Sequence, residues 1–338
     1  MPVRAYRPAW WIPGAHLRTL WGKFARSRSR IATRAVRWDT ADDDFLDLHR
    51  LDAPADAPAG APRLLILHGL EGTIRSHYVG GLMREAQLRG WAADLLIFRS
   101  CGDEPNRALR FYHSGETSDV DAVVRRLIAE DPERALVLIG VSLGGNVLLK
   151  WLGELGESVP RQVKGAAAIS VPFDLARGSR FLNRGFSRFY QAHFLRSLRR
   201  KALGKSIRYP QSISADVVRR ARTLYEFDDL VTAPVHGFRD ADDYYSQSSS
   251  LGWLAHVRTP TLLLSARDDP FLPAAVLDEV RVIARDNPSL HIEFVDRGGH
   301  VGFVSGRVPW RPIYYAEQRA GGFLSSTLAG VDARVAGA

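Results

Sequence analysis

Apolar runs of strand length, separated by stretches with helical spacing, restrict this chain to an α/β architecture more than any other feature. Four such runs are "RLLILHG", "AADLLIFRS", "ALVLIGVS" and "GAAAISVPF", at residues 63–69, 92–100, 135–142 and 165–173. Each run is continuously apolar, which is typical of strands buried on both faces of a parallel sheet. The stretches "YVGGLMREAQLRG" and "SDVDAVVRRLIAEDP" between them are predicted helices, the second beginning at Ser118 as its N-cap and ending before Pro132. We therefore predict a doubly wound α/β fold.

The alternation stops after residue 173 and resumes near residue 251. Two further strands are predicted at 260–267 and 290–296, with a helix over 274–286 between them. Because an insertion between two core strands is most simply placed over the carboxyl ends of the sheet, where such folds bind ligands, we expect residues 174–250 to form a helical cap. The expected core then comprises residues 39–173 and 251–338, and residues 1–38 form an N-terminal arm.

One stretch of the expected cap, residues 180–205, has the spacing of an amphipathic helix. Aromatic and leucine side chains recur there with arginines between them, at Phe186, Phe189, Tyr190, Phe194 and Leu198. The pattern predicts a helix that packs this stripe against the rest of the protein. The same stripe also fits a helix lying on a membrane surface.

The composition is that of a globular protein, with 46% hydrophobic and 25% charged residues over 338 positions. The single cysteine, Cys101, cannot form an intramolecular disulfide, and no secretory signal or membrane-spanning stretch is evident, so we expect a cytoplasmic protein. The net charge of +9 is concentrated in residues 1–38 and 173–222, neither of which contains a nucleic-acid-binding motif. We therefore expect no nucleic-acid partner, and leave open a peripheral contact with an anionic membrane.

The pattern G-x-S-x-G occurs where the third run passes into a helical stretch, "LIGVSLGGNVLLKWLGE". Ser142 lies between Gly140 and Gly144, and a tight strand-to-helix turn would expose its hydroxyl while larger side chains at the two glycine positions would collide. A serine hydroxyl becomes nucleophilic when an imidazole takes its proton. Ser142 is therefore the candidate nucleophile.

The order of residues in this fold places the acid and then the histidine after the serine. Of the later histidines, only His300 follows the last strand, on the glycine-rich turn "RGGHVGF". The acid should follow the strand "TLLLSAR", where Asp268 and Asp269 are adjacent. We favour Asp269, which lies directly before Pro270, and keep Asp268 as the alternative.

Acyl transfer also needs N–H donors for the negatively charged oxygen of the tetrahedral intermediate. The backbone N–H of Leu143, directly after the serine, is one candidate. The second is the N–H of Leu70, in the turn "HGLEG" after the first predicted core strand. Nothing in the sequence calls for a metal or a cofactor, and we expect none.

Six stretches of the chain resemble the YheT-like family of α/β-hydrolases, bacterial relatives of the animal abhydrolase-domain lipases. They are "HGLEGTIRSHYVGGL", "IFRSCGDEPNRALRFYHSGETSDV", "GVSLGGNVLLKWLGE", "YEFDDLVTAPVHGFRDADDYY", "ARDDPFLP" and "GGHVGFV". "RPAWWIPGAHLRTLW" and "FLDLHRL" also resemble that family's arm and first hairpin, so the resemblance covers nearly the whole chain. It implies an α/β-hydrolase fold, a mostly parallel sheet flanked by helices with a helical cap insertion. Ser100 stands where the family usually has glycine, which leaves the shape of that loop open.

The sequence thus predicts a serine hydrolase that forms an acyl-enzyme intermediate through Ser142, His300 and Asp269. The resemblance implies carboxylic esters as substrates, either short-chain acyl esters or acylglycerols. An amidase would use the same three residues, so it stays an alternative. A lipid-binding protein of the membrane surface is the alternative from a different class.

Overall fold

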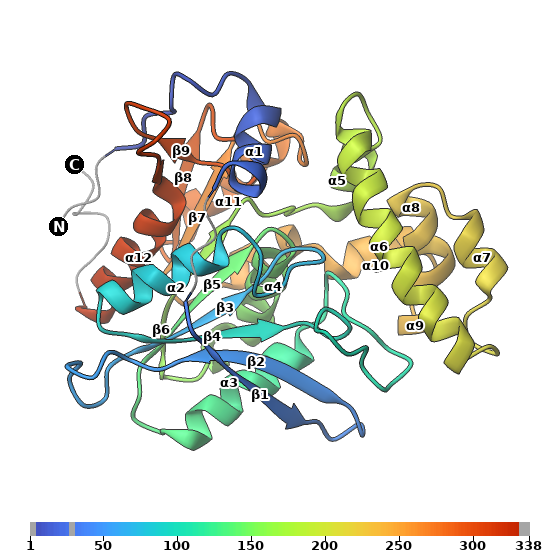
Figure 1. The fold of residues 1–338 in the computed structure, drawn as a ribbon, viewed down its shortest axis with the longest axis horizontal. Helices are drawn as coiled ribbons and strands as arrows, with labels where there is room; N and C mark the ends of the chain where they lie inside the picture. The colour runs from blue at the N-terminus through green and yellow to red at the C-terminus, as the bar shows by residue number, and fades with distance from the viewer. Residues whose placement is uncertain (1–4, 27–30, 331–338) are drawn as a thin grey trace.

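An eight-stranded sheet runs through the computed structural model, which describes residues 5–26 and 31–330 (Figure 1). Its strand order is β1-β2-β4-β3-β5-β6-β7-β8. The strands are β1 (Arg34–Asp39), β2 (Phe45–Leu51), β3 (Arg63–Leu67), β4 (Ala92–Ile97), β5 (Leu136–Val141), β6 (Val163–Ile169), β7 (Thr261–Ala266) and β8 (Leu290–Val295). Parts of the expected arm (residues 1–4 and 27–30) and of the expected core (residues 331–338) lie outside the described residues.

The sheet is parallel from β4 to β8, and antiparallel only where β2 pairs with β1 and with β4. All residues of β3, β4, β5 and β7 are buried, as expected for strands with helices on both faces. The continuous apolar runs in the sequence therefore correspond to the centre of the sheet. A second, two-stranded sheet pairs β9 (Val304–Ser305) with β10 (Ile313–Tyr314).

Helices cover the two faces of the sheet in separate groups. On one face α2 (Val79–Leu88) packs against α12 (Tyr315–Leu328), and on the other α3 (Ser118–Glu130) packs against α4 (Leu143–Leu155). The other elements of the second face are η1 (Gly156–Ser158), η3 (Ser250–His256) and α11 (Ala274–Asp286). This arrangement confirms the predicted doubly wound fold. None of the helices in residues 5–26 and 31–330 combines the length and hydropathy needed to cross a bilayer.

Six of the strands and three of the helices follow the predicted positions within a few residues. The helix over 274–286 agrees at both ends, whereas Ser118 is the first residue of α3 and not its N-cap, which is Thr117. The residues alone did not predict β1, since most of its side chains are exposed and its run is short. Charged positions leave no apolar run to recognise there.

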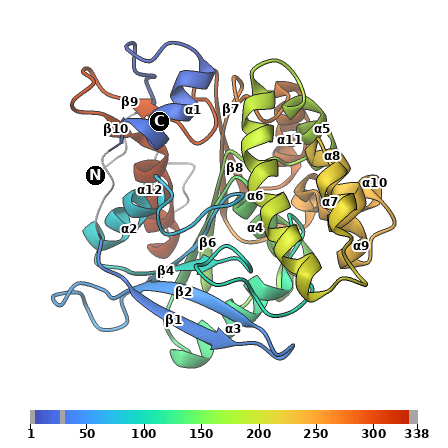
Figure 2. The ribbon, with the colours of Figure 1, turned by 45° about the vertical axis from the view of Figure 1, so that its right-hand side comes forward.

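The helices between β6 and β7 lie together at one side of the molecule, at the right in Figure 1 and nearer the viewer in Figure 2. They are α5 (Leu175–Leu182), α6 (Ser187–Arg208), α7 (Ala215–Arg220), α8 (Leu224–Phe227), the π-helical turn η2 (Asp228–Thr232), α9 (Ala233–His236) and α10 (Ala241–Ser248). Two clusters of buried side chains, separate from that around the sheet, lie largely among these helices. The boundaries 174 and 250 of a distinct cap stay a prediction.

The expected amphipathic stripe is only partly packed. Residues 180–205 are divided between α5 and α6 by a turn, in which Gly185 has φ of 47°. Tyr190 and Leu198 are buried, but Phe186 and Phe189 are 52% and 59% exposed. At roughly 100° per residue, Phe189 points away from the sector between Tyr190 and Leu198, and Phe186 lies before the first residue of α6. The prediction that the whole stripe is buried was wrong for these two residues.

Candidate active site

Ser142 occupies the sharp turn between β5 and α4. Its backbone has φ of 54° and ψ of −120°, a conformation that costs free energy for a residue other than glycine and is common at functional sites. A Cβ added at Gly140 would lie 2.4 Å from the carbonyl oxygen of Gly144, and one at Gly144 would lie 2.4 Å from that of Leu67. The two glycines therefore let the strand turn directly into the helix.

The structure brings Ser142, His300 and Asp269 into one hydrogen-bonded chain. His300 Nε2 lies 2.9 Å from Ser142 Oγ, and His300 Nδ1 lies 2.8 Å from Asp269 Oδ2. The other oxygen of Asp269 accepts the backbone N–H of Phe271 at 2.8 Å, and the Phe271 ring stacks on the imidazole with centroids 3.9 Å apart. If Nδ1 carries the proton and donates to Asp269, Nε2 is free to accept the serine proton.

The neighbouring aspartate, Asp268, points to a different partner. Its Oδ1 accepts the backbone N–H groups of Gly298 and Gly299 at 2.7 and 2.8 Å, while its Oδ2 lies 3.2 Å from Arg18 Nη1. Asp268 therefore fixes the glycine-rich turn that carries His300. Within the described residues it makes no hydrogen bond to the imidazole. The two adjacent carboxylates face different groups, and Asp269 is the one beside His300.

Two hydroxyl groups that were not predicted from the sequence accept hydrogen bonds from the backbone of the glycine-rich turn that carries His300, named the histidine turn here. The N–H of His300 donates to Thr19 Oγ1 at 2.9 Å, and the N–H of Val301 donates to Ser170 Oγ at 2.9 Å. Thr19 lies on α1 (Ala15–Phe24), which therefore packs against the site although it is far away in the sequence. Thr19 lies in the arm stretch that resembles the family, and Ser170 lies in a predicted strand, but neither pattern indicates a contact with the turn of His300.

The two predicted oxyanion donors both line the cavity beside Ser142. Within the described part of the chain, the N–H groups of Leu70 and Leu143 have no recorded hydrogen-bond acceptor. Leu143 is the first residue of α4, where N–H groups lack an intrahelical partner. Both donors are thus available to a ligand oxygen. The adjacent Gly69 N–H is occupied, since it donates to the Tyr78 hydroxyl at 2.8 Å.

His68 is the first residue of the turn "HGLEG" at residues 68–72, named the oxyanion turn here, and both of its ring nitrogens have partners within the fold. Its Nδ1 lies 2.7 Å from the carbonyl oxygen of Gly69, and its Nε2 accepts the N–H of Phe98 at 3.1 Å. Complete burial lowers the pKa of His68 to about 4, so the ring stays neutral near pH 7. Both ring nitrogens are used within the fold, and His68 has no free nitrogen to offer a substrate.

Glu71, which follows Leu70, ties the oxyanion turn to helix α6. Its carboxylate accepts from the Tyr112 hydroxyl at 2.7 Å, from Lys201 Nζ at 2.6 Å and from the Ser197 hydroxyl. Lys201 Nζ also lies 3.2 Å from Cys101 Sγ, and burial raises the pKa of that thiol to about 11. Cys101 is therefore a buried, protonated thiol, and no histidine of the described residues is hydrogen-bonded to it.

A cavity extends from Ser142 among the helices that follow β6. Most of its wall is apolar, with leucine and phenylalanine side chains from the oxyanion turn, from α5, α6 and α8, and from the loop after β7. These are Leu70, Leu175, Leu182, Phe194, Leu198, Leu224, Phe227 and Phe271. Because Ser142 lies at the end of β5, these helices cover the carboxyl ends of the parallel strands. The cavity can therefore hold an apolar chain next to the serine hydroxyl.

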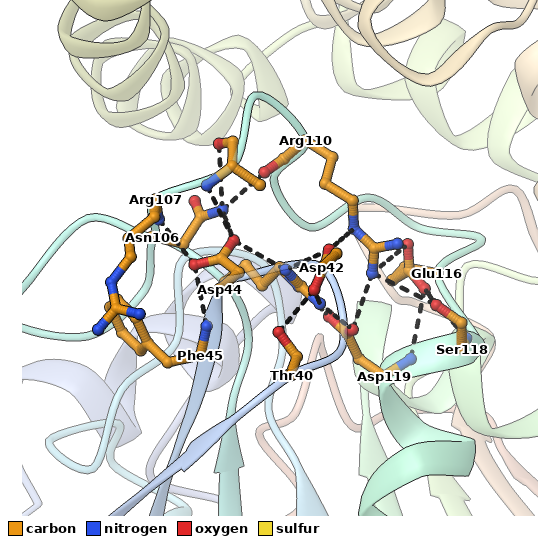
Figure 3. Close-up of polar contacts among 12 residues, drawn as sticks. Thr40, Asp42, Asp44, Phe45, Asn106, Arg107, Arg110, Glu116, Ser118 and Asp119 are labelled. Atoms are coloured by element: carbon orange, nitrogen blue, oxygen red, sulfur yellow. Dashed lines mark hydrogen bonds and ion pairs between the residues drawn. The ribbon is translucent and has the colours of Figure 1, made fainter.

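The loop from residue 99 to 117 supplies another part of the wall and is held by a buried charged network (Figure 3). Asp44 accepts the backbone N–H groups of Arg107 and Ala108 at 2.7 and 3.1 Å, the Asn106 amide at 2.5 Å and Arg99 Nη1 at 2.7 Å. Burial alone would raise the pKa of Asp44, but these hydrogen bonds outweigh it and lower the pKa to about 2. Asp44 is therefore ionised near pH 7 and fixes the loop.

Ser100 lies in the same network. Its backbone has φ of 63°, in the left-handed region that favours glycine, and its hydroxyl donates to Asn106 Oδ1 at 2.5 Å. The loop thus keeps a conformation suited to glycine although serine occupies the position. Among the described residues, no group of three or more His, Cys, Asp or Glu side chains is arranged to hold a metal ion.

Comparison with known proteins gives a consistent picture. Residues 62–306 match the protein family described as alpha/beta hydrolase fold. The protein named "Putative esterase YheT" of Escherichia coli (strain K12) is 37% identical over 315 residues, covering 93% of this chain and 91% of that protein. Monoacylglycerol lipase of Saccharomyces cerevisiae is 30% identical over 275 residues, covering 79% of this chain and 60% of that protein. Among solved structures, Pyrococcus furiosus esterase Pf2001 aligns with a TM-score of 0.57 at 16% identity, covering 90% of this chain and 98% of that one, which is a likeness of fold.

Proposed function

The chain belongs to the alpha/beta hydrolase family, and from this premise we propose that it cleaves carboxylic esters with Ser142 as nucleophile, His300 as general base and acid, and Asp269 as the partner of the imidazole. The observation that carries the proposal is the continuous chain of 2.9 and 2.8 Å contacts from Ser142 Oγ through His300 to Asp269. Relatives named esterase and monoacylglycerol lipase support an ester as the substrate.

In the acylation step, Ser142 Oγ attacks the carbonyl carbon of the ester while His300 Nε2 takes the hydroxyl proton. The carbonyl oxygen becomes negatively charged and accepts the N–H groups of Leu70 and Leu143. The bond to the alcohol then breaks, and His300 gives its proton to the departing alcohol oxygen. Ser142 is left as an acyl ester. Asp269 accepts from Nδ1 throughout and stabilises the imidazolium.

In the deacylation step, water attacks the acyl carbon and His300 Nε2 takes a proton from it. The same two N–H groups stabilise the second tetrahedral intermediate. Ser142 Oγ then leaves and regains its proton from His300, which releases the carboxylic acid. Every proton transfer uses one imidazole nitrogen, so the fixed position of the histidine turn matters for both steps.

The apolar cavity supports an acyl chain as the part of the substrate beside Ser142. We propose short-chain acyl esters or monoacylglycerols as the substrate class. A panel of p-nitrophenyl esters from acetyl to palmitoyl, with monoacylglycerols and matched anilides, ranks these possibilities and includes amides. The proposal expects esters to be turned over well above the anilides.

The variant Ser142→Ala tests the proposal. Ester turnover should fall by at least about 10⁴-fold because no other group can form the acyl-enzyme, while the melting temperature stays the same. Full turnover by Ser142→Ala would reject the proposed nucleophile. Thermal unfolding of both proteins shows whether any loss comes from misfolding.

A second candidate function, contact with an anionic membrane, is favoured by the surface near the turn between α5 and α6. Phe186 and Phe189 are exposed there, and the exposed Arg184 and Arg188 lie beside them in sequence. Exposed aromatic rings next to arginines are suited to the interface of an anionic bilayer. Sedimentation with anionic vesicles tests this: a Phe186→Ser, Phe189→Ser double variant should bind less. Absence of wild-type binding at low salt would reject it.

A further inference from the structure

The wall of the cavity is not apolar throughout. Hydroxyl groups and a carboxyl group gather on one part of it, contributed by α5, η2 and α10, at Ser179, Asp228, Thr232, Tyr244 and Tyr245. This polar part shares one continuous cavity with Ser142 and Leu143. A substrate bound at the serine can therefore extend to it. None of these polar side chains takes part in the steps proposed above.

Asp228 is the central group of this polar part. The Thr232 hydroxyl donates to Asp228 Oδ1 at 2.8 Å, and the Tyr245 hydroxyl donates to Asp228 Oδ2 at 2.7 Å. Each carboxylate oxygen can accept more than one hydrogen bond, so both oxygens keep capacity for a ligand. Asp228 as a residue is only partly buried, and it lines the cavity.

No cation of the described chain balances the charge of Asp228. Its recorded partners are the neutral Thr232 and Tyr245, with no lysine or arginine among them. Burial raises the pKa of Asp228 to about 6, against the opposing effect of the two hydrogen bonds. The carboxyl group is therefore mostly ionised above about pH 7. An unbalanced charge in a largely apolar cavity is costly, and a ligand cation would relieve that cost.

Aromatic side chains line the cavity together with the same carboxyl group. The rings of Tyr244 and Tyr245 have centroids 5.2 Å apart, and both residues line the cavity together with Phe227. Aromatic faces attract cations, and they do so more strongly where water is excluded. A carboxylate beside tyrosine rings in a largely apolar cavity is thus suited to a positively charged nitrogen.

We propose that the part of the cavity around Asp228 is a subsite for a protonated amine carried by the substrate, several bonds away from the scissile carbonyl. This inference rests on the proposed ester hydrolysis, because it places the ligand in the cavity that opens at Ser142. Three observations support it. Asp228 accepts two hydrogen bonds from neutral hydroxyl groups, no cation of the described residues balances its charge, and tyrosine rings are close by. The subsite determines which esters are preferred and takes no part in bond breaking.

Matched p-nitrophenyl esters test the subsite. The acyl groups are an alkanoyl chain, its ω-hydroxy analogue and its ω-amino analogue of equal length, each in a graded series of lengths. At pH 8 the wild type should show a kcat/KM for the amino ester at least about ten-fold above that for the alkanoyl ester at one chain length. Amino esters that are too short to reach Asp228 should lose this preference.

The variant Asp228→Asn removes the charge and keeps a side chain of the same size. The ratio of kcat/KM for the amino ester to that for the alkanoyl ester should fall at least about ten-fold relative to the wild type. Asp229→Asn is the matched control, because Asp229 caps the Ala241 N–H at 3.0 Å and does not line the cavity. Its ratio should equal that of the wild type. The ratio is taken within each protein, so a change in overall activity cancels.

A pH series on the wild type gives a test that needs no variant to fold. As pH falls from 8 to 5, Asp228 becomes protonated and the ratio should decline, while a primary amine stays charged throughout. The pKa values of Tyr244 and Tyr245 are raised by burial, and those of His113 and His236 are lowered by burial to about 3, so all four groups stay neutral over this range. Any change in overall activity with pH that is common to both esters cancels in the ratio.

The outcomes separate the subsite from the proposed reaction. No preference for the amino ester at any length overturns the inference, as does an equal or greater preference for the hydroxy ester. An Asp228→Asn variant that keeps the wild-type ratio also overturns it and leaves Asp228 a structural role. In each case continued hydrolysis of the alkanoyl esters, lost only in Ser142→Ala, would leave the proposed function standing.

Discussion

The reactive centre and the cavity that leads to it are built from different parts of the chain and in different ways. Ser142 and Asp269 follow the ends of core strands, and the turn that carries His300 is held through its backbone N–H groups, which donate to Asp268, Thr19 and Ser170. The cavity wall comes mainly from the helices after β6 and from the loop after β4, which charged and hydroxyl side chains hold in place. The residues of the proposed chemistry thus follow core strands, whereas most of the cavity wall comes from the helices between β6 and β7 and from the loop after β4.

Asp269→Asn is expected to have the largest effect and acts on the reactive centre alone. An amide cannot hold the imidazole in the required tautomer, so kcat should fall by about 10³- to 10⁴-fold, as measured with a short p-nitrophenyl ester. Asp268→Asn is the matched control. Since Asp268 fixes only the turn that carries His300, its loss should lower kcat by about ten-fold or less. Equal losses in the two variants would contradict the assignment.

Asp44→Asn acts instead on the loop at residues 99–117, which forms part of the cavity wall. Removing one charge of the buried Asp44–Arg99 pair should lower the free energy of unfolding by about 3 kcal/mol at pH 7, as measured by urea denaturation. The pKa of Asp44 is lowered in the folded protein, so its contribution is present above about pH 4 and is lost as pH falls towards 2. The difference between variant and wild type should therefore shrink between pH 4 and 2. The exposed neighbour provides the control, Asp43→Asn, which should change stability little.

Leu182→Trp alters the cavity without touching the reactive centre. Leu182 lies in the cavity wall on α5, and a larger side chain there takes space from a long acyl group. The ratio of kcat/KM for a decanoyl ester to that for an acetyl ester should fall about ten-fold. The control is Leu230→Trp, at an exposed position that does not line the cavity. A uniform loss on both esters would mean that the two regions are not separable.

Thr19→Val is expected to have the smallest effect. The variant keeps the shape of the side chain but removes the oxygen that accepts the N–H of His300, so kcat should fall about three- to ten-fold. Thr19→Ser, which restores the hydroxyl, should recover most of the activity. No difference between the valine and serine variants would show that α1 does not position the histidine turn.

The difference between the reactive centre and the cavity wall also explains how much of each could be predicted from the sequence. Continuous apolar runs predicted the central strands, and the chain order of Ser142, Asp269 and His300 indicated side chains that the structure brings together. Thr19 could not be predicted, because 281 positions separate it from His300 and only the tertiary fold joins them. The catalytic roles of Ser142, Asp269 and His300 stay predictions.

The inserted helices were harder to predict for a physical reason. Apolar spacing in residues 180–205 indicates a helix but does not say which sector of it finds a partner, so the exposure of Phe186 and Phe189 was missed. Nor does the sequence reveal that Asp228, one of many aspartates, lies in a cavity wall. A charged residue in an apolar wall is recognised only once the surrounding elements are in place.

Covalent labelling tests the central claim most directly. A fluorophosphonate probe reacts with a serine hydroxyl that a histidine activates, and mass spectrometry of the digested protein locates the adduct. The account predicts a single adduct on Ser142 in the wild type, a much slower reaction in Asp269→Asn, and none in Ser142→Ala. An adduct on another serine, or an unreactive wild type that is correctly folded, would contradict it.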